Sequence, residues 1–83
     1  MITIYGKEGC PFCVKARDLC ESRAYNYRYL TMGVDYPRDQ FFEIFPSAKT
    51  VPQIIINETK IGGYNELVQY IEETGYNGTG STL

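Results

Sequence analysis

The feature that most constrains this chain is the segment Cys10-Pro11-Phe12-Cys13, which lies between a strand-like and a helix-like stretch. Residues 2–5 are mostly β-branched or aromatic, a composition typical of a short buried strand. From residue 11 onward apolar side chains recur at helical spacings, and proline suits the first turn of a helix. The sequence therefore predicts that Cys10 lies at the N-terminus of a helix and Cys13 one turn further along.

Strand-like and helix-like patterns alternate along the rest of the chain. The expected elements are a strand at 2–5, a helix from 11, a strand at 27–32, a helix at about 37–45, a strand at 51–56, a returning strand from 60, and a helix at 64–71 that ends at Gly75. Three phenylalanines within 41–45 predict that the second helix faces the core. The order β-α-β-α-β-β-α is that of the thioredoxin-like α/β fold, so we expect a four-stranded mixed sheet flanked by three helices.

Length and composition narrow the class of protein. A chain of 83 residues with 43% hydrophobic residues is expected to form one domain spanning 1–83, with a frayed tail at about 77–83. The formal net charge of −2 provides no footprint for nucleic acid or an anionic membrane, and no apolar stretch suggests an export signal or membrane span. Three cysteines cannot form a fully paired secreted scaffold and favour a reducing compartment. We expect a cytoplasmic monomer.

The two cysteines of the segment can close a small disulfide loop, because one helical turn brings their sulfurs together. At a helix N-terminus the free backbone N–H groups and the helix dipole favour an anion, so the thiol pKa of Cys10 should fall. Lys7 adds a positive charge nearby in the sequence. Cys13, deeper in the helix, suits a thiol that attacks a mixed disulfide from within. We expect Cys10 to be the nucleophile and Cys13 the resolving cysteine.

A structural zinc site is the main alternative use of this cysteine spacing. Zinc takes four ligands, and the chain has no histidine and only one further cysteine, Cys20, so we expect no metal site. Cys20 follows Cys13 by seven residues, on the same apolar stripe as Ala16 and Leu19. Buried cysteines usually pack as small apolar side chains and stay inert, so Cys20 is predicted to lie in the core.

Three segments together resemble the dithiol glutaredoxin family: Cys10-Pro11-Phe12-Cys13 after the first strand, Thr50-Val51-Pro52 before a later strand, and Gly62-Gly63-Tyr64 before the last helix. The resemblance extends from about residue 2 to residue 71. Family members commonly have tyrosine where this chain has Phe12, which keeps the aromatic ring and lacks the hydroxyl. The resemblance also implies a cis bond between Val51 and Pro52, facing the active site.

The same resemblance implies that glutathione is a co-substrate and that no cofactor is tightly bound. Glutathione is an extended peptide, which can pair with a free strand edge, and its carboxylates suit backbone N–H groups at a helix start. The residues that would contact it are Lys7 and Phe12 at the glycyl end, Thr50, Val51 and Pro52 along the cysteinyl part, and Gly63, Tyr64 and Asn65 at the γ-glutamyl carboxylate.

Two details of this glutathione site stay open in the sequence. Asn65 stands where the family often has aspartate, so its side chain brings no charge to the ammonium group of the ligand. The family often places a basic or amide residue on the second helix, against the glycyl carboxylate. Either Arg38 or Gln40 could take that role here.

A protein of this family would reduce protein disulfides and glutathione mixed disulfides through the Cys10 thiolate, with ribonucleotide reductase as a candidate partner. One alternative is a thioredoxin-like electron donor that is reduced by a flavin reductase, against which the glutathione-site resemblance of Gly62-Gly63-Tyr64 counts. Another alternative is a carrier of an iron–sulfur cluster, bridged between two chains by Cys10 and glutathione. Pro11 and the second cysteine, Cys13, count against that carrier.

Overall fold

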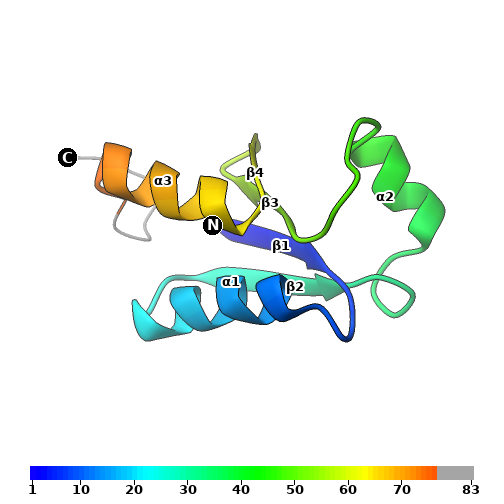
Figure 1. Cartoon of the computed structure of the whole chain (residues 1–83), viewed down its shortest axis with the longest axis horizontal. Coiled ribbons are helices and arrows are strands. Elements are labelled where there is room, and N and C mark those ends of the chain that lie inside the picture. The colour runs from blue at the N-terminus through cyan, green and yellow to red at the C-terminus, as the bar shows by residue number, and fades with distance from the viewer. Residues whose placement is uncertain (77–83) are drawn as a thin grey trace.

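The computed structural model describes residues 1–76, in which three helices surround one four-stranded sheet (Figure 1). In chain order the elements are β1 (Ile2–Gly6), α1 (Pro11–Ser22), β2 (Tyr27–Thr31), α2 (Arg38–Ile44), β3 (Gln53–Ile56), β4 (Thr59–Gly62) and α3 (Tyr64–Thr74). This is the order that the sequence predicts, and the thioredoxin-like fold class is confirmed. The predicted frayed tail lies outside the described residues.

The sheet is mixed and has the strand order β2-β1-β3-β4. Strand β1 runs parallel to β2 and antiparallel to β3, while β4 runs antiparallel to β3. Parallel neighbours need a crossover connection, which α1 provides between β1 and β2. In this register Ile4 lies between Tyr29 on β2 and Ile54 on β3. The cysteine segment therefore follows a central strand, which holds it firmly in place.

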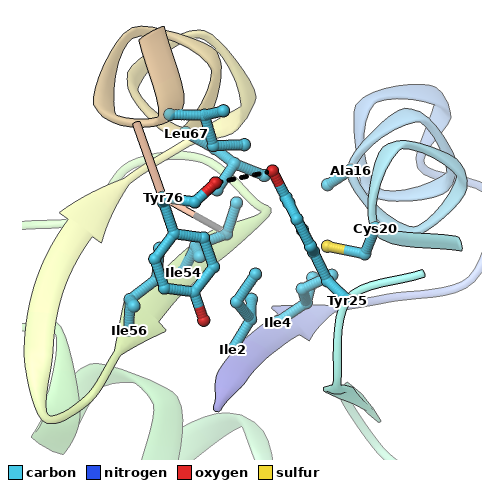
Figure 2. Packing of buried hydrophobic residues seen from close by; sticks show 10 residues of the cluster. Ile2, Ile4, Ala16, Cys20, Tyr25, Ile54, Ile56, Leu67 and Tyr76 are labelled. Carbon is cyan, nitrogen blue, oxygen red and sulfur yellow. Dashed lines mark hydrogen bonds between the residues drawn. The ribbon is translucent and has the colours of Figure 1, made fainter. Parts of the chain in front are cut away.

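The main core lies between one face of the sheet and the two helices α1 and α3 (Figure 2). Its buried side chains include Ile2, Ile4, Ile54 and Ile56 from the sheet, Ala16 and Cys20 from α1, and Leu67 and Ile71 from α3. Burying each isoleucine or leucine stabilises the fold by ~1.5–3 kcal/mol. At the edge of this core the Tyr25 hydroxyl donates to the carbonyl oxygen of Tyr76 at 3.1 Å (Figure 2). Cys20 is fully buried here, as predicted.

Helix α2 builds a second, smaller cluster that includes strand residues of the opposite face, at the end of the molecule away from α3 (Figure 1). Phe41 and Phe45 are buried in it, together with Tyr36. The second helix thus faces the core, as predicted, through Phe41 and Phe45, but not through Phe42, whose side chain is 41% exposed. Residues four apart share one helix face, whereas the residue next to Phe41 points about a quarter-turn away. Instead, Phe42 lies under the guanidinium of Arg38, 5.6 Å from its ring centre.

All four strands differ from the prediction by one or two residues at one end, since β1 extends to Gly6 and β4 begins at Thr59. Strand β3 begins at Gln53 and not at Val51, because Pro52 has no N–H to donate to the sheet. Strand β2 ends at Thr31, and Met32 forms only an isolated bridge with Tyr36. The last helix ends as predicted at Gly75, whose φ of 66° suits glycine. Across the described range 1–76, no helix combines the length and apolar character that crossing a membrane requires.

Candidate active site

Cys10 and Cys13 are joined by a disulfide at the beginning of α1, with their Cα atoms 5.2 Å apart. Cys10 has extended backbone angles and is the N-cap residue of the helix, and Pro11 occupies the first helical position. The backbone N–H of Cys13 points at the Cys10 sulfur, with 3.2 Å between the nitrogen and Sγ. An N–H group directed at this sulfur would stabilise a thiolate more than a neutral thiol, which lowers a thiol pKa.

The two cysteines differ in their access to solvent. Cys10 is 8% exposed, whereas Cys13 is completely buried behind it. A substrate sulfur can therefore approach Cys10 but has no path to Cys13. This difference agrees with the roles expected from the sequence, in which the first cysteine attacks and the second resolves the mixed disulfide.

The segment before β3 passes directly beside the disulfide. The carbonyl oxygen of Val51 lies 3.6 Å from the Cys10 sulfur, although 41 residues separate them in the chain. The bond between Val51 and Pro52 is cis, as the family resemblance implies. Pro52 itself is buried, and Val51 is half-buried. The backbone of Val51 is thus positioned next to the reactive sulfur, where a substrate peptide would lie.

A groove of about 260 Å³ starts at this point and extends to the beginning of α3. Its lining consists of Phe12, Thr50, Val51, Pro52, Gly63, Tyr64, Asn65 and Glu66. Every glutathione contact expected from the sequence is in this set except Lys7. The ring of Phe12 is half exposed and lies 6.2 Å from the ring of Tyr64, so these two aromatic side chains form one wall.

A second hollow, of about 280 Å³, adjoins the groove and shares Thr50 and Val51 with it. Three basic residues line this hollow together with apolar side chains: Lys7, Arg38 and Lys49. Lys7 therefore lies on the α2 side of the disulfide. Of the two candidates on the second helix, Arg38 lines the hollow, while Gln40 does not.

Glu66 was not identified from the sequence, although it lines the groove. Its carboxylate accepts a hydrogen bond of 2.8 Å from the backbone N–H of Gly63, the N-cap residue of α3. Gly62, just before, has a φ of +120°, and a Cβ there would lie 2.9 Å from the Glu66 side chain. The spacing of Gly63 and Glu66, three residues apart, is that of a capping box and could have indicated this contact.

A tyrosine pair behind the disulfide was also not identified from the sequence. A Cβ on Gly6 would lie 2.6 Å from the hydroxyl oxygen of Tyr29 and 3.1 Å from the Cys13 sulfur. The Tyr36 hydroxyl donates to the Gly6 carbonyl oxygen at 2.9 Å. Burial raises the pKa of Tyr36 to about 12, so this hydroxyl remains protonated. Glycine at the end of β1 was the available signal, because a close approach of side chains demands it.

Cys20 has no part in this arrangement. Burial among apolar side chains raises the pKa of its thiol to about 11, and the nearby Glu21 adds to the effect. A thiol that stays protonated is a poor nucleophile. No group of three or more histidine, cysteine, aspartate or glutamate side chains in residues 1–76 is arranged to hold a metal ion.

A disulfide at a helix N-terminus, with one accessible and one buried sulfur and a peptide-sized groove beside it, defines a dithiol–disulfide oxidoreductase of the thioredoxin-fold class. Comparison with known sequences makes the class more specific. Residues 2–61 match the sequence profile of the Glutaredoxin family. The chain belongs to the glutaredoxin family.

Individual relatives agree with this membership. The chain is 31% identical over 77 residues to Glutaredoxin 1 of Escherichia coli (strain K12), an alignment covering 84% of this chain and 91% of the relative. It is 34% identical over 79 residues to a glutaredoxin of Vibrio cholerae, covering 87% and 91%. The crystal structure of Glutaredoxin 1 from Francisella tularensis in complex with cacodylate is similar, with a TM-score of 0.74, 28% identity and coverage of 87% and 92%. The predicted oxidoreductase activity is confirmed, and neither alternative is favoured.

Proposed function

We propose that the protein uses glutathione to reduce protein disulfides and glutathione mixed disulfides, with Cys10 as the attacking sulfur. The observation that carries this proposal is the groove beside the disulfide, whose lining brings together all the expected glutathione contacts except Lys7, from three separate segments of the chain. A buckwheat glutaredoxin that shares the fold, with a TM-score of 0.69 and 20% identity, has been solved as a complex with glutathione.

The groove and the hollow together suit an extended tripeptide with a carboxylate at each end. The free backbone of Val51 would pair with the cysteinyl residue, as an added strand pairs with a sheet edge. N–H groups at the start of α3 would bind the γ-glutamyl carboxylate. Lys7 and Arg38, across the shared wall, would attract the glycyl carboxylate. We therefore assign the role that the sequence left open to Arg38 in preference to Gln40.

The ammonium group of the γ-glutamyl residue needs a negatively charged partner at the α3 end of the groove. Asn65 brings no charge there, but the carboxylate of Glu66 lines the same groove. This carboxylate accepts a hydrogen bond from the Gly63 N–H, which holds it at the N-terminus of α3, where it can attract a cation. Glu66 would thus supply the negative charge that Asn65 lacks.

The proposed reaction proceeds by two thiol–disulfide exchanges. The Cys10 thiolate attacks one sulfur of the substrate disulfide, and the other sulfur leaves as a thiolate with the electron pair of the broken bond. With a glutathione mixed disulfide, a second glutathione thiolate then attacks the adduct on Cys10 and releases oxidised glutathione. With a protein disulfide, Cys13 can instead attack Cys10, which releases the reduced protein and closes the Cys10–Cys13 disulfide.

The partners and surroundings of the protein are part of the same proposal. A reducing compartment such as the cytoplasm supplies the glutathione that the reaction consumes, and the free thiol of Cys20 is compatible with it. The substrates would be disulfide-containing proteins, with ribonucleotide reductase as one candidate. The protein would act as a monomer. Gel filtration tests the monomer, and imaging of the tagged protein in cells tests the location.

The deciding experiment is reduction of a small glutathione mixed disulfide, coupled to glutathione reductase and followed through the nicotinamide cofactor. We expect rapid turnover that is abolished in Cys10→Ser and retained in Cys13→Ser, because this reaction needs only one thiol. Equal loss in both variants would contradict the assigned roles. Absence of turnover, with reduction of the disulfide by a flavin reductase instead, would favour a thioredoxin-like donor.

A further inference from the structure

The side chains of Tyr29 and Cys13 both border the space that Gly6 leaves free. The Cβ position of Gly6 is 2.6 Å from the Tyr29 hydroxyl oxygen and 3.1 Å from the Cys13 sulfur, so both atoms border one small volume. Tyr29 is on β2 and pairs with Ile4 of β1, which directs its ring to the same face of the sheet as α1. The hydroxyl thus lies at the buried end of the redox disulfide.

A negative charge is harder to place on the Cys13 sulfur than on the Cys10 sulfur. When the disulfide is reduced, or when Cys13 attacks a mixed disulfide, its sulfur has to carry a negative charge. Its side chain is fully buried, and burial away from water disfavours a thiolate. A hydrogen-bond donor at the buried end would offset this penalty, because hydrogen bonds to a charged group are stronger than those to a neutral one.

Tyr29 has the properties of such a donor. Within residues 1–76 its hydroxyl donates to no protein group in the disulfide form, so it is available as a donor. Desolvation raises the pKa of Tyr29, which keeps the hydroxyl protonated at neutral pH. The guanidinium of Arg17 lies 5.4 Å from the centre of the ring and holds the side chain against α1.

We propose that the Tyr29 hydroxyl donates a hydrogen bond to the Cys13 sulfur while that sulfur is a thiolate, and so promotes both formation and opening of the Cys10–Cys13 disulfide. This inference rests on the proposed role of Cys13. In closure, the Cys13 thiolate forms a bond to the Cys10 sulfur, and the substrate or glutathione sulfur leaves with the electron pair of the broken bond. In opening, glutathione bonds to Cys10, and the electron pair of the broken disulfide remains on Cys13.

The other titratable or charged groups around this point are few. Arg17 of α1 lies over the Tyr29 ring, Tyr36 from the segment before α2 is hydrogen-bonded to Gly6, and Cys10 is the partner sulfur. The Tyr36 hydroxyl is already used by the Gly6 carbonyl oxygen. Tyr29 is therefore the group on the sheet side with a free donor.

The test measures the rate at which a glutathione adduct on Cys10 is converted to the Cys10–Cys13 disulfide. The reduced protein is mixed with oxidised glutathione across a pH series, quenched with acid, and analysed by mass spectrometry. We expect Tyr29→Phe to shift the pH profile of closure upward by about one unit. Below the midpoint closure slows only about threefold, because the more basic thiolate that remains is a better nucleophile.

The shape of the profile separates a hydrogen bond from mere packing. A variant that only misplaces Cys13 would close slowly at every pH, whereas loss of the donor leaves the limiting rate at high pH undiminished. Tyr27→Phe is the matched control, because Tyr27 is on the same strand and its hydroxyl binds the exposed Glu21. An unshifted profile in Tyr29→Phe, or an equal shift in Tyr27→Phe, would overturn the inference.

Two further measurements test the inference and the proposed function separately. In the unsubstituted reduced protein, the NMR signal of the Tyr29 ring carbon that bears the hydroxyl should follow a thiol titration, and this response should vanish in Cys13→Ser. A Tyr29 signal that ignores the thiol would contradict the inference without any change in folding. Failure of Cys13→Ser to form a glutathione adduct on Cys10 would instead contradict the proposed function, and the inference would fall with it.

Discussion

The two ends of the active-site disulfide lie in contrasting surroundings. The Cys10 end borders solvent, receives a backbone N–H from the helix start, and opens onto a groove and a basic hollow. The Cys13 end is closed by Gly6 of β1 and by the Tyr29 hydroxyl of β2. A short helical segment can thus hold two chemically similar thiols in different roles, because its first turn runs from the surface into the interior.

Cys20 provides a third case, on the same helix. Like Cys13 it is fully buried, but its neighbours are the apolar side chains of the main core (Figure 2). Burial, with an added effect of the nearby Glu21, raises its thiol pKa to about 11. The comparison teaches that burial alone makes a cysteine inert, whereas burial beside a polar group can leave it able to react.

The largest effect should come from removing the resolving sulfur while the attacking sulfur remains. With a protein disulfide as substrate and no glutathione present, Cys13→Ser is expected to accumulate a covalent adduct through Cys10, because nothing can displace the substrate. Non-reducing gel electrophoresis would show the adduct, and a reductant should cleave it. Trapping by Cys10→Ser in place of Cys13→Ser would reverse the assignment of the two ends.

Filling the space behind Cys13 should be the next largest effect. Gly6→Ala introduces a methyl group 2.6 Å from the Tyr29 hydroxyl oxygen, and we expect a loss of ~1–3 kcal/mol in the free energy of unfolding. Urea denaturation measures it. The double variant Gly6→Ala/Tyr29→Phe should recover part of the loss, because the closest atom is gone. If Gly6→Ala did not destabilise the protein, the space between Gly6, Tyr29 and Cys13 would have to be larger than these distances show.

Cys20 should make stability depend on pH in the alkaline range. Its folded-state pKa of about 11 lies above the ordinary value of 9.0, so its contribution is complete below pH 9 and is lost as the pH rises through 11. Relative to Cys20→Ala, the unsubstituted protein should lose ~1–2 kcal/mol more between these limits. The tyrosines titrate in both proteins, so their contribution cancels in the difference apart from the effect of the Cys20 charge on Tyr27 and Tyr76. If the free energy of unfolding had the same pH dependence in both proteins, the Cys20 thiol would not be desolvated.

The smallest effect concerns the open end of the site. Arg38→Gln should raise the KM for a glutathione mixed disulfide about threefold at low salt, because an exposed ion pair contributes little and is screened by ions. Gln40→Ala, two residues away and outside the hollow, is the control and should leave the KM unchanged. If the control variant changed the KM and Arg38→Gln did not, the glycyl carboxylate would have to bind on the Gln40 side.

Local patterns in the sequence account for the elements and for the reactive pair. The cysteine spacing, the proline at the helix start and the glycine at the end of the last helix act through neighbouring residues, so they are readable without the fold. The resemblance of three short segments to glutaredoxins was also sufficient to anticipate every groove residue except Glu66. It could not show which of them meet, since Lys7 lies in the adjoining hollow.

What only the tertiary structure decided are the contacts between distant segments. The place of Arg38 in the hollow, the place of Glu66 in the groove and the exposure of Phe42 depend on how a helix is rotated against the sheet. The meeting of Tyr29 with Cys13 depends on the parallel pairing of β1 with β2 and on the missing side chain of Gly6. Sequence by itself determined where the thiols stand on their helix, through local hydrogen bonding and periodicity. The environment of each sulfur required packing, because it is built from side chains that lie far apart along the chain.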